Sequence, residues 1–373
     1  MKSKLFTPLK LRSVILRNRI VVSPMRQYSA ENGFANDWHL VNYGKFAQAG
    51  AGMVVVETAA VEARGRITYG DLGIWSNEHV ALLARIASFI REQGAVPAIQ
   101  LGHAGRMSGM QRPWEGGGAL GEAQIARGEA PWQGLAPSAI PFAPEWPVPL
   151  TMTNVHLEEV AAAWEAAARR AIRAGFDALE LHCASGYLLH EFLSPTTNLR
   201  SDAYGGDARR RMTYPLHVVK RVRAVWPPGK PLLCRVPVAD DSDGDAGIEE
   251  SIEFSREIKS LGVDVIACSA GGIRRYPTSS KRSRSVAAGV SCAAQIRNGA
   301  HVSTMAEGSV FDAQLAEDIL ASAHADLIGI ANEAVFNPNW PLHARGALES
   351  DGFDEWPRQY GWRLEKQAFA RES

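Results

Sequence analysis

The chain has 373 residues, 46% of them hydrophobic and 21% charged, and its forty basic side chains balance forty acidic ones. This is an ordinary globular composition, and the balanced charge argues against a nucleic-acid partner or a charged membrane surface. No apolar run reaches the ~18 to 20 residues of a membrane span, and the start lacks the apolar core of a signal peptide, so we expect a cytoplasmic protein with no membrane partner.

Short apolar runs alternate with amphipathic stretches along the chain. The strand-like runs are Ile20 to Val22, Met53 to Val56, Val96 to Leu101, Ala178 to Leu181, Leu232 to Val236, Val265 to Cys268, His301 to Thr304 and Leu327 to Ile330. Helical candidates with a spacing near 3.6 residues are Val80 to Gln93, Leu157 to Ala174, Thr213 to Val225, Ile248 to Ser260 and Asp312 to Ala321. This alternation is typical of βα units with a parallel sheet.

Eight such units close most economically as an α/β TIM (β/α)8 barrel, with residues 1–373 as a single domain. An open doubly wound sheet is the alternative, but no GxGxxG follows the first strand. Before Ile20, two apolar triplets around a turn predict a β-hairpin that plugs the N-terminal face of the barrel. The stretch 107–152, rich in Gly, Pro and Trp without a period, predicts an excursion after the third strand that is partly a lid.

Polar side chains follow the ends of the predicted strands, where TIM barrels place their chemistry. They are Ser23, Pro24, Met25, Arg26 and Tyr28 after the first strand, Thr58 to Ala60 after the second, Gln100 and His103 at the third, His182, Ser185 and Tyr187 at the fourth, and Arg235 at the fifth. Together they suit a flat polar heterocycle. Taken singly, Gln100 or Arg235 could instead pair with a neighbouring loop, and His182 and Tyr187 could be hydrogen-bonded core residues.

A phosphate is expected beyond the seventh and eighth strands, where TIM barrels bind phosphates with loop N–H groups and a helix N-terminus. Gly308 and Ser309 fit the first half of such a site. The cysteines Cys183, Cys234, Cys268 and Cys292 show no metal-ligand spacing, so neither a metal site nor a disulfide framework is expected.

The stretch GYLLHEFLSP at Gly186 to Pro195, followed by SDAYGG, resembles the Old Yellow Enzyme family of flavin (FMN) ene-reductases. The resemblance covers nearly the whole chain, through LFTPLKLRSVILRNRIVVSPM near the start, GRITYGDLGIWSNEH, AIQLGHAGR and NPNWPL. The short length and NDWH at Asn36 to His39 are most similar to the xenobiotic reductase A side of the bacterial thermophilic-like branch. It implies that the chain is an FMN-dependent, NAD(P)H-oxidising ene-reductase that passes hydride from flavin N5 to an activated C=C.

The resemblance also assigns roles to single residues. It implies that Tyr187 donates the proton, that His182 and Ser185 bind the substrate's oxygen, that Arg235 and Gln100 face the flavin's N1/O2 and pyrimidine edges, and that Ser23, Pro24, Met25 and Ala60 line the flavin. It places Gly308, Ser309 and Asn332 at the phosphate, and Arg26, Tyr28 and Trp362 at the small-molecule substrate. A phenol with a pKa near 10 can donate a proton at neutral pH without strong perturbation.

Three of these positions depart from the family's usual residues. Ser185 stands where the family has histidine or asparagine, Arg26 where the branch has cysteine, and Asn332 where the family has arginine. Arg26 could raise the flavin's potential, hold an anionic substrate, or pair with a loop carboxylate. Asn332 removes a charge-assisted contact worth about 1.5 to 3 kcal/mol, so FMN binding is expected to be weak unless the basic stretch Arg274 to Arg284 compensates. That stretch could also contact NADPH or be a solvated loop.

The C-terminal stretch 354–373 contains WPRQYGW at Trp356 to Trp362. The resemblance identifies it as a segment that reaches into a neighbouring subunit, so a homodimer or homotetramer is expected. Two alternatives to an ene-reductase stay open. One is an FMN barrel with other redox or isomerase chemistry on an anionic substrate held by Arg26, and the other is a degenerate flavin-binding protein with little turnover.

Overall fold

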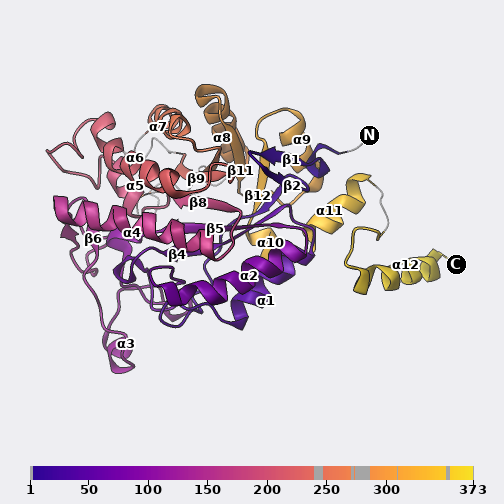
Figure 1. Ribbon diagram of the computed structural model, residues 1–373, viewed down its shortest axis with the longest axis horizontal. Coiled ribbons are helices and arrows are strands. Elements are labelled where there is room, and N and C mark those ends of the chain that lie inside the picture. Colours follow the sequence, from indigo (N-terminus) through magenta and orange to yellow (C-terminus); the bar gives the residue numbers. More distant parts are fainter. Residues whose placement is uncertain are drawn as a thin grey trace.

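The computed structural model describes residues 3–238, 247–269, 273, 286–308, 310–349 and 353–372. Among these residues, eight parallel strands close into a barrel in the order β10-β11-β12-β3-β4-β5-β8-β9. The strands are β3 (Ile20–Val22), β4 (Met53–Ala60), β5 (Val96–Gly102), β8 (Ala178–His182), β9 (Leu232–Pro237), β10 (Val265–Ser269), β11 (Ser303–Glu307) and β12 (Leu327–Ile330). The predicted TIM barrel is confirmed (Figure 1).

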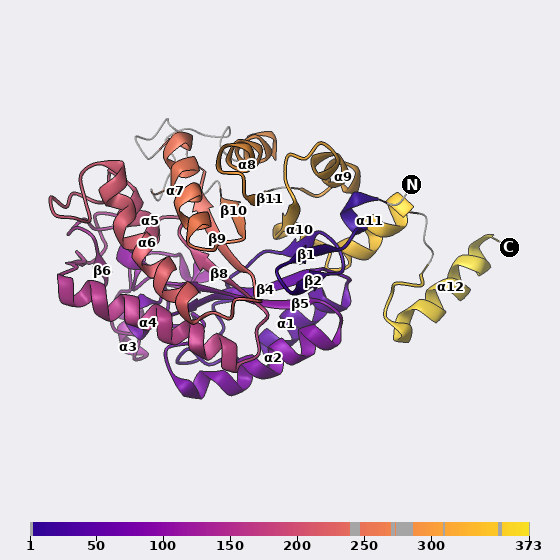
Figure 2. The same ribbon diagram turned by 45° about the horizontal axis from the view of Figure 1, so that its top comes forward.

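Helices surround the barrel and cover its outer face (Figures 1 and 2). The longer ones are α1 (Asp37–Gln48), α2 (Val80–Glu92), α4 (Asn154–Arg173), α6 (Ala208–Val225), α7 (Ile248–Ser260), α8 (Val286–Ala300), α9 (Ala313–Ala321) and α11 (Trp340–Glu349). α4 shows why they form, since its buried face repeats at helical spacing through Leu157, Val160 and Trp164. Thr153 caps this helix by accepting a hydrogen bond from the His156 amide at 3.3 Å, which starts α4 three residues earlier than predicted.

The interior of the barrel is a separate apolar cluster. Alternate residues of the strands point inward and fill it, as expected for a packed TIM core. The hairpin of β1 (Leu9–Leu11) and β2 (Val14–Leu16) closes the N-terminal end of the barrel, because Leu11 and Leu16 are buried in this same cluster. Figure 1 shows the hairpin lying across that end, so the predicted plug is confirmed.

The long excursion follows β5, the third barrel strand, as predicted. It contains α3 (Glu122–Ala126), β6 (Leu135–Ala136) and β7 (Leu150–Thr151), and the last two form a short parallel pair. α3 lies at the tip of this excursion, which extends away from the barrel at the bottom of Figure 1. At its root, the Arg106 guanidinium donates to the carbonyl of Ile273 at 2.8 Å, which ties the excursion to the loop after β10.

The boundaries of two strands differ from the sequence prediction. β11 runs over Ser303–Glu307 instead of His301 to Thr304, because His301 adopts a left-handed φ of 52° that a strand excludes. β4 continues four residues beyond Val56, through a bulge that shifts its register against β5. Both changes move polar residues onto the C-terminal edge of the barrel.

The first and last described elements, Lys4–Phe6 and α12 (Arg358–Glu372), lie on the same side of the barrel (Figures 1 and 2). The first turn, Lys4–Phe6, is held by the Glu317 carboxylate of α9, which accepts hydrogen bonds from the amides of Lys4 at 2.8 Å and Leu5 at 2.9 Å. Two short helices, α5 (Leu188–Leu193) and α10 (Asn332–Phe336), follow strands β8 and β12. The last helix, α12 (Arg358–Glu372), lies apart from the barrel in both views (Figures 1 and 2). Within the described ranges, no helix has the length and apolarity that crossing a bilayer demands.

Candidate active site

The last inward-facing layer of the barrel is polar. Val21, Ala98, Ala178, Leu233 and Met305 belong to the buried interior cluster. Because strand side chains alternate, the residues two positions further on face the same way, at the C-terminal mouth. They are Ser23, Gln100, Glu180, Arg235 and Glu307. The fold therefore brings three of the predicted flavin-binding residues together and adds two carboxylates.

An ion pair in this layer joins β9 to β11, the two strands on either side of β10. The Arg235 Nη1 lies 2.8 Å from one carboxylate oxygen of Glu307 and 3.0 Å from the other. The Ser23 hydroxyl donates a further hydrogen bond to Glu307 Oε1 at 2.7 Å. Arg235 Nε is buried and has no hydrogen-bond partner among the described residues. The Nη1 atom of the guanidinium is thus paired with Glu307, while its Nε remains available to a bound molecule.

A second hydrogen-bonded chain runs through Gln100. Its carbonyl oxygen accepts from the Thr58 hydroxyl, and its Nε2 donates to Glu180 Oε1 at 2.6 Å. Burial, followed by the nearby Glu307 carboxylate, raises the pKa of Glu180 to about 7. Glu180 is therefore partly protonated near neutral pH, and the hydrogen bond from Gln100 holds its side chain in place.

His182 stands at the end of β8 as a neutral imidazole. Burial, and then the Arg235 and Arg26 charges, hold its pKa well below the usual range. Its Nδ1 accepts a hydrogen bond from the Ala184 amide at 3.3 Å, so Nε2 carries the proton. The arrangement leaves Nε2–H as a donor for a substrate oxygen.

Tyr187 lies directly beside His182, with ring centroids 4.8 Å apart in an edge-to-face arrangement. Between them, Ser185 adopts a left-handed φ of 60°, which turns the chain sharply and brings Tyr187 to the N-terminus of α5. The turn thus places Ser185 between the His182 imidazole at the end of β8 and the Tyr187 phenol at the start of α5. This is the cluster that the sequence nominated for catalysis.

Arg26 reaches this cluster from β3. Its Nη1 donates to the Tyr187 hydroxyl at 2.6 Å, and its guanidinium carbon lies 4.5 Å from the centre of the Tyr187 ring. Its Nε lies 3.8 Å from Asp71 Oδ2. The guanidinium thus contacts both the phenol and a loop carboxylate.

Tyr28, also after β3, packs its ring edge-to-face against the Trp114 ring of the excursion, with the ring centroids 6.1 Å apart. Burial raises the pKa of the Tyr28 phenol.

The remaining predicted residues are placed less centrally. Pro24 and Met25 are half-buried beside Ser23, and Ala60 is the buried last residue of β4. Gly308 has a φ of 143° and open space where a Cβ would be, while Asn332 begins α10 and is exposed. Trp362 is 48% exposed and belongs to α12, the helix that lies apart from the barrel of its own chain (Figure 2). Ser309 and the basic stretch 274–284 lie outside the described residues.

The sequence reasoning missed Glu180, Glu307 and Asp71. The rule that nominated Gln100 and Arg235, a polar residue at the C-terminal end of a strand, would also have found Glu307 had β11 been placed correctly. Glu180 stood inside the apolar run and was read as part of it, although strand alternation places it beside His182 on the inner face.

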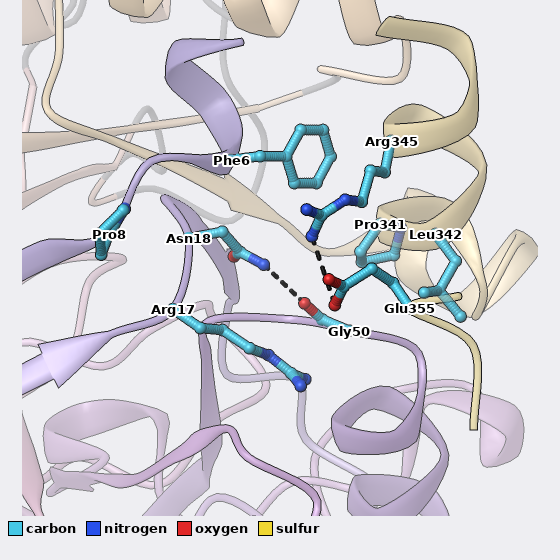
Figure 3. Close-up of a pocket in the computed structure, with 9 residues that line it drawn as sticks. All are labelled: Phe6, Pro8, Arg17, Asn18, Gly50, Pro341, Leu342, Arg345 and Glu355. Carbon is cyan, nitrogen blue, oxygen red and sulfur yellow. Dashed lines mark hydrogen bonds and ion pairs between the residues drawn. The ribbon is translucent and has the colours of Figure 1, made fainter. Parts of the chain in front are cut away.

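A cavity of about 230 Å³ lies at the opposite end of the barrel (Figure 3). Figure 3 shows Arg345 paired with Glu355, and the Asn18 amide donating to the carbonyl of Gly50. The Arg17 guanidinium donates to three backbone carbonyls, those of Ala47, Ala51 and Gln93. The contacts of Arg17 and Asn18 join the residues that follow the N-terminal hairpin to the ends of α1 and α2. Residues at this face of a TIM barrel typically serve stability.

The barrel mouth fits FMN in most respects. Arg235 Nε is an unused buried donor, Gln100 Nε2 has a second N–H beyond the one that it donates to Glu180, and Gly308, just after β11, leaves open space where a phosphate is expected. Glu307 is the exception, since it adds a carboxylate beside the arginine.

The comparisons with known proteins identify the family of the chain. Residues 4–351 match the model of the NADH:flavin oxidoreductase / NADH oxidase family. An NADPH dehydrogenase of Geobacillus sp. (strain WCH70) is 37% identical over 371 residues, covering 98% of this chain and 100% of the relative. An NADPH dehydrogenase of Listeria monocytogenes serotype 4a (strain HCC23) is 39% identical over 363 residues, covering 96% of this chain and 98% of the relative. The chain belongs to this NADH:flavin oxidoreductase family of Old Yellow Enzymes.

Solved structures share the fold. Morphinone reductase in complex with tetrahydroNAD has a TM-score of 0.76 at 23% identity, covering 93% of this chain and 91% of the other. The Old Yellow Enzyme homologue from Zymomonas mobilis has a TM-score of 0.74 at 22% identity, covering 93% of each. Family membership confirms the predicted class, an FMN-dependent oxidoreductase that uses a reduced nicotinamide dinucleotide. The closer likeness to xenobiotic reductase A stays a prediction.

Proposed function

We propose that this protein is an NADPH-oxidising ene-reductase that reduces an activated C=C, with Tyr187 as the proton donor. The observation that carries the proposal is the cluster of His182, Tyr187 and Arg26 at the mouth of a barrel whose family uses FMN. The choice of NADPH follows the names of the Geobacillus and Listeria relatives. Anaerobic spectra test it, because NADPH should bleach the flavin absorbance and an enone should restore it.

FMN would lie against Arg235 and Gln100 with its phosphate near Gly308 and Asn332, and when bound and reduced it supplies the hydride. His182 Nε2–H and the Ser185 hydroxyl bind the substrate's oxygen and withdraw electron density from the C=C. The Tyr187 phenol gives its proton to the alkene carbon next to the activating group. Arg26 then stabilises the phenolate that remains, since its Nη1 already donates to that oxygen.

The substrate we favour carries a carboxylate or nitro group as its activating group. Arg26 is the cation closest to the phenol, and its ordinary family counterpart is uncharged. Arg26→Cys should therefore weaken kcat/KM for an unsaturated acid by about ten- to a hundredfold, equal to about 1.5 to 3 kcal/mol, and should affect cyclohexenone less. The comparison is kcat/KM for the two substrates in both proteins. An equal loss for both would mean that Arg26 acts only through Tyr187 or through folding.

Ser185→His should raise kcat/KM for cyclohexenone, because a second imidazole reaches further toward a carbonyl oxygen than a hydroxyl does. The left-handed φ of 60° at this position tolerates histidine better than a β-branched residue. Ser185→Ala is the matched control and should lower the same kcat/KM. If Ser185→Ala leaves kcat/KM for cyclohexenone unchanged, Ser185 does not bind the substrate's oxygen.

We also propose that α12 binds a neighbouring subunit in a homodimer or homotetramer. Tyr360 is 52% and Trp362 is 48% exposed on a helix that lies apart from its own barrel, and aromatic residues are enriched at interfaces. Light scattering of the chain with Trp362→Ala against wild type tests this, with a shift toward monomer expected.

A further inference from the structure

The Glu307 carboxylate is built into the flavin site by its own strand. Its side chain is 7% exposed and points inward from the last position of β11. A Cβ on Gly329, the register partner of Glu307 in β12, would lie 2.8 Å from Glu307 Cγ and 2.7 Å from the Ser23 hydroxyl. Because such contacts are too short for a side chain, only glycine leaves room for Glu307 to reach Ser23 and Arg235 there.

Three ionisable groups meet in this layer. Arg235 is the cation, Glu307 pairs with it at 2.8 Å, and Glu180 lies close enough for both to affect its titration. Arg235 is largely buried, with 19% of its side chain exposed, so water screens this pair less than a surface pair. The guanidinium and the Glu307 carboxylate together carry no net charge.

Reduction of a flavin adds negative charge to the ring edge that an arginine usually faces. A bare guanidinium favours the reduced form, since a fixed positive charge stabilises charge that develops beside it. A carboxylate that already neutralises the guanidinium removes much of that preference. We infer that Glu307 lowers the reduction potential of bound FMN by neutralising Arg235. This inference rests on the proposed position of the flavin ring against Arg235.

The test is the midpoint potential of the FMN-loaded protein in wild type, Glu307→Gln, and Glu307→Gln combined with Arg235→Met. Glutamine keeps the length of the side chain and a carbonyl oxygen for the Ser23 hydroxyl. We expect Glu307→Gln to favour reduced over oxidised flavin at least tenfold more than wild type does, which is about 30 mV for a two-electron couple. Adding Arg235→Met should return the potential to near the wild-type value. The matched control is Glu253→Gln on exposed α7, which should cause no shift.

The three proteins test the inference about Glu307 separately from the proposed position of the flavin ring against Arg235. If Glu307→Gln has the wild-type potential and the added Arg235→Met lowers it, the flavin lies against Arg235 but Glu307 does not neutralise it, and the inference fails. If Glu307→Gln raises the potential and Arg235→Met leaves it high, the proposed position of the flavin is wrong and the inference fails with it. Should the variants not fold, the wild type decides alone, because a bound potential well above that of free FMN would contradict a neutralised arginine.

Discussion

Tyr187→Phe is expected to leave reduction of the flavin by NADPH intact and to slow its reoxidation by an enone by about two to four orders of magnitude, the usual range for a positioned general acid. Phenylalanine removes the hydroxyl that would give the proton and keeps the ring that packs edge-to-face on His182 at 4.8 Å. Stopped-flow measurement of the two half-reactions separates the effects. The reductive half-reaction is the internal control.

The contact with Arg26 sharpens this experiment. Arg26→Met keeps the length of the side chain near Tyr187 but removes the charge that lies 2.6 Å from the phenol oxygen. It should slow the same oxidative step by a smaller factor, because the phenol remains. Equal oxidative rates in wild type and Tyr187→Phe would exclude Tyr187 as the proton donor.

Asn332→Arg is expected to tighten FMN binding by about ten- to a hundredfold, which corresponds to one charge-assisted hydrogen bond to the phosphate. Asn332 is exposed at the start of α10, which follows β12, and β12 pairs with the strand that ends just before Gly308, so an arginine has room to extend toward a phosphate there. The wild type should accordingly purify with less than one FMN per chain. Fluorescence titration of the apoprotein gives both affinities.

Asn332→Lys is a useful comparison, because lysine supplies the charge without the two-pronged geometry of arginine. Riboflavin is the control ligand, since it lacks the phosphate and should gain nothing from either substitution. If wild-type FMN binding is already tight and Asn332→Arg changes nothing, another group holds the phosphate.

The barrel could be predicted from the sequence because buried parallel strands are continuous apolar runs and the polar residues after them mark the functional face. That rule located Arg26, His182 and Tyr187. It failed at β11, where the left-handed φ of His301 sets the start of the strand and leaves no trace in a hydrophobicity pattern. Helix α1 was also missed, although Asn36 forms hydrogen bonds with the Trp38 amide and the His39 side chain that start it.

Contacts between distant residues could not be predicted from the sequence. Arg26 and Tyr187 are separated by 161 positions, and whether the guanidinium turns to the phenol, to Asp71 or to a ligand depends on the side chains around it. The pairing of Glu307 with Arg235 likewise required the register of β9, β10 and β11. Sequence patterns give the position of a side chain on a strand, while its partner on another strand is set by the order and register of the strands in the folded barrel.

Closure of the barrel has a consequence for biosynthesis. β3, near the start of the chain, pairs with β12, near its end, and the first turn binds α9 through Glu317. The edges of both strands stay open until the last strand has left the ribosome, so the N-terminal half must wait in a partly folded form with an exposed strand edge. A nascent chain that stalls before residue 330 would expose that edge to aggregation, and chaperones should therefore engage this protein until β12 has been synthesised.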